Sequence, residues 1–224
     1  VLLQDTMNPI PDSAAGSELV CGRFRLDLSE PRLMAIVNVT PDSFSGDGLA
    51  HDADAALARA EAAVREGAEL LDVGGESSRP GSDPVSEQEE MDRVMPLVER
   101  LADWPVPVSV DTVKPAVMRA ALAAGASLIN DINAFRAPGA IDAVAASGAA
   151  LCVMHMRGEP RTMQDDPVYE DVVGEVAAFL DERVAALRAA GVADARIVLD
   201  PGFGFGKTLE HNLALLRGIG RFCG

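Results

Sequence analysis

Short apolar segments alternate with amphipathic segments along most of the chain. The apolar segments, each of a length typical of a buried strand, lie at 33–39, 69–74, 106–111, 127–132, 149–155 and 196–200. Between and after them, the pattern predicts helices at 52–66, 86–102, 114–124, 138–147, 170–190 and 209–220. Strands that alternate with helices form a parallel sheet covered on both faces. The pattern therefore predicts an α/β fold of six consecutive strand–helix units.

Residues at the segment ends support the predicted helices. Asp52 can serve as the N-cap of the first helix. Ser86-Glu87-Gln88-Glu89 has the sequence of a capping box. Glycine follows four of the helices, at positions 67, 125, 148 and 191, where a helix commonly ends.

Six units without a long insertion favour a (β/α)8 barrel over an open sheet, because no Gly-x-Gly-x-x-Gly turn follows the first strand. A full barrel has eight units and about 250 residues. We therefore expect the sequence as given to lack the last two βα units. Residues 1–21 have the composition of a loosely ordered leader, and residues 22–224 form the expected barrel domain. Within that domain, residues 23–28 alternate with period two and predict a short strand.

The charge balance and the cysteines exclude several classes of protein. The chain has 19 Lys and Arg against 35 Asp and Glu, a net charge of −16, which argues against general binding to nucleic acid or anionic membranes. Cys21, Cys152 and Cys223 are far apart and no Cys-x-x-Cys occurs, so we expect neither a disulfide framework nor a structural zinc site. No apolar run is long enough for a membrane span, and we expect a cytoplasmic protein.

Polar residues follow the predicted strands, where the active site of a barrel lies. Asn38 ends the first strand, Pro41 stops it and Asp42 favours a turn. The amide oxygen of Asn38 is a neutral ligand suited to Mg²⁺. The alternative is a plain turn closed by an Asx-type hydrogen bond.

Asp111, Asn130 and Asp200 end the third, fourth and sixth strands. A carboxylate can accept two parallel N–H bonds, and an Asn can both donate and accept. The three residues therefore suit a flat heterocycle rich in N–H and NH₂ groups, although each alone could instead cap the next helix. The loop 75–81 offers backbone N–H groups, hydroxyls and Arg79, which suit phosphate. Such a loop can also be only a flexible connector.

Two further motifs indicate structure rather than chemistry. Residues 202–208 resemble a phosphate-binding Walker A loop, but position 201, where that motif needs glycine, is proline. His155 lies between two methionines on a core strand, where a structural histidine fits at least as well as a general base. His51 and His211 fall at helix starts and are expected to be solvated.

Six motifs in order along residues 22–217 resemble dihydropteroate synthase. They are residues 38–45 (NVTPDSFS), 72–81 (DVGGESSRPG), 110–112 (VDT), 129–132 (INDI), 154–156 with 160–164 (MHM and PRTMQ), and 200–207 (DPGFGFGK). The resemblance implies a (β/α)8 barrel and a homodimer that acts in bacterial folate synthesis and is the target of sulfonamides. It also implies a reaction, the joining of p-aminobenzoate to 6-hydroxymethyl-7,8-dihydropterin pyrophosphate with Mg²⁺ and release of pyrophosphate.

The resemblance also implies a role for individual residues. Asn38 matches the Asn that contacts Mg²⁺, and the expected catalytic residues are Arg79, Asp111 and Asp200. The expected substrate contacts are Asp111, Asn130, Met154 and Asp200 for the pterin, Ser78 and Arg79 for the pyrophosphate, Phe44, Pro80 and Phe205 for the aminobenzoate, and Lys207. In the implied mechanism, Mg²⁺ and Arg79 stabilise the departing pyrophosphate, and the amine attacks without a covalent enzyme intermediate.

The sequence departs from the family pattern in a few places. Ser78 stands where the family more often has Thr, a change that keeps the hydroxyl. The family's Ser-Arg-Lys-Ser and Arg-x-His motifs after the last two strands do not occur, and we expect the sequence as given to omit a C-terminal portion. Two alternatives stay open: a methyltetrahydrofolate-dependent methyltransferase and a non-catalytic pterin-binding paralogue. The loops around Ser78 and Pro41 favour the synthase.

Overall fold

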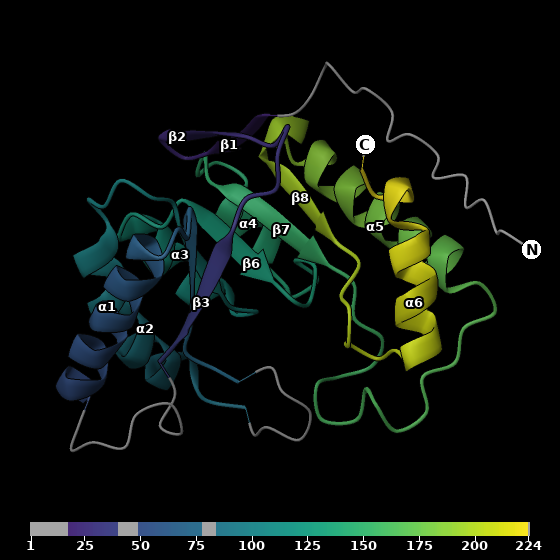
Figure 1. The fold of residues 1–224 in the computed structure, drawn as a ribbon, viewed down its shortest axis with the longest axis horizontal. Coiled ribbons are helices and arrows are strands. Elements are labelled where there is room, and N and C mark those ends of the chain that lie inside the picture. Colours follow the sequence, from purple (N-terminus) through teal and green to yellow (C-terminus); the bar gives the residue numbers. More distant parts are fainter. Residues whose placement is uncertain (1–17, 40–48, 78–83, 224) are drawn as a thin grey trace, which may run out of the picture.

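Six parallel strands form the centre of the molecule (Figure 1). The computed structural model describes residues 18–39, 49–77 and 84–223, without the side chains of residues 49–52. Each strand pairs with the next along the chain, in the order β3-β4-β5-β6-β7-β8. The strands are β3 (Met34–Asn38), β4 (Leu70–Gly74), β5 (Val108–Asp111), β6 (Leu128–Asp131), β7 (Ala150–Met154) and β8 (Ile197–Asp200). All six predicted strands are therefore confirmed.

A helix follows each strand and covers the outer face of the sheet (Figure 1). The helices are α1 (Leu49–Arg65), α2 (Glu87–Leu101), α3 (Pro115–Ala123), α4 (Ala140–Val144), α5 (Val172–Ala189) and α6 (Leu209–Arg217). Short 3₁₀ turns, η2 (Asp194–Arg196) and η3 (Ile219–Arg221), precede β8 and follow α6. The six predicted helices are confirmed. The fourth is shorter than expected, because it begins only after Gly139, whose φ is +80°.

The helix starts differ in part from the sequence prediction. Helix α1 begins at Leu49, so Asp52 lies inside the helix and is not its N-cap. The Ser86 hydroxyl does cap α2, but the carboxylate of Glu89 pairs with Arg93 instead of completing a capping box. The complete capping box lies at α6, where Thr208 and His211 each accept the other's backbone N–H at 3.2 Å. His211 therefore stabilises a helix start.

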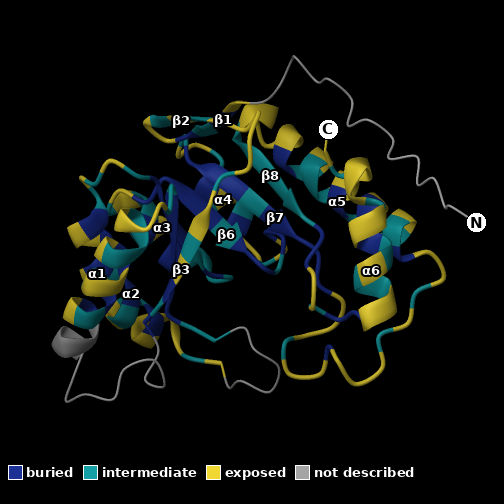
Figure 2. Ribbon diagram, viewed as in Figure 1, coloured by how far each residue is buried: buried dark blue, intermediate teal, exposed yellow. Residues whose placement is uncertain are grey.

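The two faces of the strands have different partners, and β4 and β7 are more fully buried than β3 at the edge of the sheet (Figure 2). One set of side chains points outward and packs against the helices in the main core. This set includes Leu71, Val73, Val110, Ile129, Leu151 and Val153, all fully shielded from solvent. The alternate residues face the inner side of the sheet, and near the carboxyl ends of the strands these are polar. Polar and apolar residues therefore alternate towards the carboxyl ends of the strands.

A hairpin of β1 (Glu18–Cys21) and β2 (Phe24–Asp27) covers the other end of the sheet (Figure 1). Leu19 and Cys21 pack against the first residues of β6 and β7, and the Cys21 thiol donates to the carbonyl of Ser127 at 3.0 Å. The predicted strand at 23–28 is confirmed as β2. The last four residues of the expected leader, 18–21, are a strand of this hairpin, whereas residues 1–17 lie outside the described residues. The division at residue 21 otherwise stays a prediction.

None of the helices that the structure describes is both long and apolar enough to cross a bilayer.

Candidate functional site

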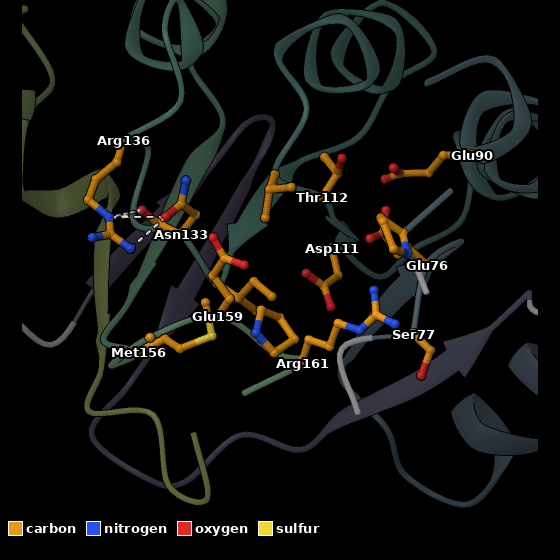
Figure 3. A pocket seen from close by; sticks show the side chains of 15 residues that line it. Glu76, Ser77, Glu90, Asp111, Thr112, Asn133, Arg136, Met156, Glu159 and Arg161 are labelled. Atoms are coloured by element: carbon orange, nitrogen blue, oxygen red, sulfur yellow. Dashed lines mark hydrogen bonds between the residues drawn. The ribbon is translucent and has the colours of Figure 1, made fainter. Parts of the chain in front are cut away.

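A pocket of about 800 Å³ opens at the carboxyl ends of the strands (Figure 3). The loops that follow β4, β5, β6 and β7 supply most of its wall. They contribute Glu76 and Ser77, Asp111 to Val113, Ile132, Asn133 and Arg136, and Met156 with Gly158 to Arg161, while Pro84 and Glu90 complete the lining. Of the predicted site residues in the described part of the chain, Asp111 lines this pocket, whereas Asn38, Asn130, Met154, Asp200, Phe205 and Lys207 are not among the lining residues.

Two of the predicted pterin contacts lie side by side. Asp111 on β5 pairs in register with Asn130 on β6, and on its other side with Gly74 of β4. Asp200, the third, ends β8 and pairs in register with Met154 at the end of β7. The sheet thus gathers Asp111, Asn130 and Asp200 at one edge, as expected from parallel strands that end at the same level.

Asp72 is a polar residue of this site that the sequence analysis did not select. It faces inward from β4, is 6% exposed, and its Oδ2 accepts a hydrogen bond of 3.2 Å from Nδ2 of Asn130. This bond fixes which way the Asn130 amide points. Oδ1 of Asp72 and Oδ1 of Asn130 are buried without a hydrogen-bond partner in the described part of the chain. A charged residue within Leu70-Leu71-Asp72-Val73 was the available signal, because an all-buried strand rarely carries one.

The electrostatic surroundings of the site are strongly acidic. Burial raises the pKa of Asp72 and of Asp200, and it raises the pKa of Asp111 well above its usual range. For Asp111 the negative charges of Asp72, Asp131, Glu90 and Glu76 act in the same direction as burial. Such carboxyl groups favour a ligand that brings N–H donors or a developing positive charge.

One lysine partly offsets this negative charge at the edge of the pocket. The ammonium of Lys114, just before α3, pairs with both Glu76 and Glu90. Burial lowers the pKa of Lys114, but the two carboxylates outweigh burial and leave that pKa above its ordinary value. Arg93 of α2 also donates to the carbonyl of Gly75 at 2.8 Å. These contacts anchor the start of the loop that follows β4.

Met154 and Phe205 belong to an apolar cluster beside the pocket. Ile132, Met154, Met156 and Met163 are buried together, and Val113 and Phe205 pack against them. Of these, Ile132, Met156 and Val113 also line the pocket. The cluster therefore gives the pocket an apolar wall next to the acidic strand ends.

Lys207 is placed differently from a substrate contact. It is 3% exposed, and its ammonium donates to the carbonyl oxygens of Gly202 and Phe205 at 2.8 and 2.9 Å. His155 supplies two further acceptors, Nδ1 at 3.0 Å and the carbonyl oxygen at 3.3 Å. Because these groups use its donors inside the protein, the arrangement does not support the predicted contact of Lys207 with substrate.

His155 fits the structural alternative of the sequence analysis. Its ring packs edge-on against Phe179, with 5.0 Å between ring centroids. Burial, reinforced by the charge of Lys207, lowers the pKa of His155 to about 4. The imidazole is therefore neutral at pH 7 and accepts from Lys207.

Asn38 ends β3 at the same edge of the sheet, and its amide oxygen lies directly over the backbone of Gly74. No group of three or more His, Cys, Asp or Glu that could hold a metal ion occurs among the residues described. The other predicted contacts, Phe44, Ser78, Arg79 and Pro80, lie outside the described residues.

Known proteins resemble this chain over most of its length. A family model described as "Pterin binding enzyme" matches residues 34–223. The dihydropteroate synthase of Neisseria meningitidis serogroup B is 51% identical over 201 residues, which cover 88% of this chain and 70% of the relative. That of Escherichia coli K12 is 48% identical over 198 residues, with the same coverage. The chain belongs to the dihydropteroate synthases of the pterin binding enzyme family.

Solved structures of dihydropteroate synthases agree with this placement. The Burkholderia cenocepacia enzyme complexed with 7,8-dihydropteroate is 55% identical, with a TM-score of 0.83 over 92% of this chain and 71% of that one. The Yersinia pestis enzyme with a sulfonamide drug complex is 48% identical, with a TM-score of 0.84 over 90% and 74%. The six described βα units are thus part of a (β/α)8 barrel.

The comparisons also decide between the functions left open by the sequence. As a dihydropteroate synthase the protein is a transferase of folate biosynthesis, which condenses 6-hydroxymethyl-7,8-dihydropterin pyrophosphate with p-aminobenzoate. The synthase prediction is confirmed over the methyltransferase and the non-catalytic paralogue.

Proposed function

We propose that the strand ends hold the pterin during this condensation through Asp111, which lines the pocket, and through Asn130 and Asp200 at the same edge of the sheet. The observation that carries the proposal is the convergence of these acceptors on one edge of the sheet, next to two buried oxygens without partners. A pterin ring offers N–H and NH₂ donors in one plane, which match such acceptors. The Burkholderia cenocepacia and Xanthomonas albilineans enzymes in complex with 7,8-dihydropteroate support this choice of ligand.

The acidic surroundings also suit the bond changes of the reaction. The C–O bond between the pterin methylene and pyrophosphate breaks, the C–N bond to the amine forms, and the amine loses one proton. Positive charge develops on the pterin as pyrophosphate departs, and the carboxylates of Asp111 and Asp200 stabilise it. The aromatic amine is itself the nucleophile, so the protein needs to orient it and exclude water.

The residues present fit the Mg²⁺ ion that the family implies. Asn38 offers a neutral amide oxygen at the same edge of the sheet, next to Gly74. A magnesium ion keeps several water ligands and takes others from substrate phosphates, so one protein oxygen is a sufficient anchor. When bound, the ion would neutralise charge on the departing pyrophosphate. We propose Asn38 as the residue that would hold it.

Four further residues complete the proposed site, although they lie outside the described residues. We propose that Ser78 and Arg79 bind the pyrophosphate, with Arg79 stabilising its charge as it leaves. Phe44 and Pro80 would contact the aminobenzoate together with Phe205. The Xanthomonas albilineans enzyme with 4-aminobenzoic acid supports this second ligand. The anchored start of the β4 loop, at Gly75 and Glu76, is consistent with a fixed base for Arg79.

We also propose that the protein is a cytoplasmic homodimer, as the family resemblance implies. Three leucines on α6 (Leu209, Leu213 and Leu216) are 74%, 40% and 59% exposed, and an exposed apolar helix face is consistent with burial in a larger assembly. Sedimentation equilibrium measures the mass directly, and a monomer at all concentrations would contradict the proposal.

The activity is tested by incubating the purified protein with the pterin pyrophosphate, Mg²⁺ and p-aminobenzoate. Pyrophosphate release that depends on the amine is expected. Release that persists without the amine would indicate hydrolysis, and pterin binding without turnover would contradict a synthase. An unchanged rate in excess chelator would contradict the role of Mg²⁺.

The assignment of the pterin contacts is tested with Asp200→Asn. Loss of one charge-assisted hydrogen bond is expected to weaken pterin binding about 10-fold or more, measured by isothermal titration calorimetry. Asp194→Asn is the matched control, because Asp194 is an exposed carboxylate paired with Arg188 away from the pocket. Equal pterin affinity in the two variants would refute the assignment of Asp200.

A further inference from the structure

The buried ammonium of Lys207 joins the segment that follows β7 to the turn that follows β8. Lys207 closes the turn that follows β8, residues 201–207, here named the β8 turn. Two acceptors of its ammonium, the carbonyl oxygens of Gly202 and Phe205, belong to the β8 turn itself. The other two belong to His155, the first residue after β7. A single charged group therefore joins the turn to the neighbouring strand end.

The backbone of the β8 turn lies directly against the segment 155–157. Gly202 and Gly206 have φ of +69° and +65°, and a Cβ on either would overlap a carbonyl oxygen, that of His155 or that of Arg157. The Tyr169 hydroxyl donates to the carbonyl of Gly206 at 2.9 Å. Gln164 also donates to the carbonyl of Gly204. Hydrogen bonds from residues outside the turn, Gln164 and Tyr169, therefore help to fix its position.

The β8 turn contacts both Asp200 and the apolar cluster beside the pocket. At its start, the N–H of Gly202 donates to Oδ1 of Asp200 at 2.7 Å. Further on, the Phe205 side chain packs against the methionine cluster whose members Ile132 and Met156 line the pocket. The ammonium of Lys207 donates to the carbonyl of that same Phe205.

Lys207 lies among groups that keep it out of reach of a ligand. It is 3% exposed, with its ammonium enclosed by His155 and the β8 turn. The charge of Asp200 acts on it from the end of β8, but burial outweighs this and lowers the pKa of Lys207 to about 8. The ammonium is therefore still largely protonated at pH 7.

We propose that Lys207 is a positioning residue that fixes Phe205 for the aminobenzoate, without contacting substrate itself. The proposal rests on the proposed function in one respect, the placing of the aminobenzoate beside Phe205. It states that Lys207 affects the binding of the aminobenzoate and not that of the pterin.

The test is Lys207→Met, which keeps the length of the side chain and removes its charge. Steady-state kinetics are measured for each substrate in turn, with near-UV circular dichroism and thermal unfolding as checks that the variant is folded. We expect the KM for p-aminobenzoate to rise about 10-fold or more, because loss of the hydrogen bond to the Phe205 carbonyl displaces Phe205. The KM for the pterin pyrophosphate is expected to stay within about two-fold. Arg188→Met, which removes an exposed charge paired with Asp194, is the matched control.

Equal increases in both KM values, or none in either, would overturn the proposal. If Lys207→Met does not fold, Tyr169→Phe replaces it, since this change removes only the bond to Gly206. A selective increase of about two- to five-fold in the KM for p-aminobenzoate is then expected, and an unchanged value would overturn the proposal. Failure of the proposed function is distinguishable, because the unaltered protein would then release no pyrophosphate in response to the amine.

Discussion

Lys114 and Lys207 are the two lysines of the chain, and their surroundings differ in kind. Lys114 lies between two carboxylates, Glu76 and Glu90, which raise its pKa despite burial. Lys207 lies among carbonyl oxygens and a neutral imidazole, and burial lowers its pKa to about 8. Dipoles solvate an ammonium less completely than opposite charges do, so the two sites stabilise their loops by different means.

The comparison separates the two sides of the pocket. Lys114 ties the start of the β4 loop, through Glu76, to α2. Lys207 ties the β8 turn to the end of β7. Lys114 therefore supports the loop proposed to bind pyrophosphate, and Lys207 supports the turn proposed to contact the aminobenzoate.

The largest effect is expected for Lys114→Met. It leaves the carboxylate of Glu90, whose side chain is 1% exposed, buried without its partner. Breaking a buried ion pair in this way costs about 3–5 kcal/mol in the free energy of unfolding, which urea denaturation measures. The double variant Lys114→Met/Glu90→Gln is expected to recover part of this loss. If the single and double variants are equally unstable, the carboxylate is not the cause.

An effect of intermediate size is expected for His155→Gln, and it depends on pH. The folded-state pKa of His155 is lowered to about 4 from an unfolded value of 6.5, so the folded protein favours the neutral ring. As the pH falls from 6.5 to 4, the unfolded chain binds a proton that the folded chain does not, and stability is lost. The Gln variant lacks this loss, which amounts to about 3 kcal/mol.

The measurement is urea unfolding of both proteins between pH 7 and pH 4. The stability advantage of the unaltered protein over the variant is expected to shrink across this range. A constant difference between the two would show that His155 is not held neutral beside Lys207.

The smallest effect is a difference between the pKa values of the two lysines, which can be measured directly. NMR of ε-carbon-labelled lysine gives one signal for each lysine, and Lys114→Arg assigns them. We expect the Lys207 signal to titrate with a midpoint of about 8, and the Lys114 signal to titrate above 10.5. Equal midpoints would contradict the proposed difference between the environments of the two lysines.

Much of the fold could be predicted because its signals are local. The strand and helix ranges follow from runs of apolar residues and from their period, and all six units were found. The convergence of Asp111, Asn130 and Asp200 could also be predicted, because the carboxyl ends of parallel strands meet at one edge. These inferences need no knowledge of which residues touch.

What was missed depends on contacts between residues far apart in the sequence. The strand 18–21 is stable because it pairs with β2 and packs on β6 and β7, which its own composition does not reveal. Asp72 matters through Asn130, 58 residues away. Lys207 is separated from His155 by 52 residues, and nothing in the pattern around Lys207 distinguishes an internal ammonium from one that faces substrate.

The close approach of the β8 turn to the segment 155–157 limits which substitutions the turn can accept during evolution. Gly202 and Gly206 cannot accept a side chain, because one would overlap the facing carbonyls. Phe203 is 41% exposed, whereas Phe205 is partly buried against the apolar cluster beside the pocket. Inherited changes in this turn that alter the choice of aromatic amine are therefore expected to concentrate at Phe205.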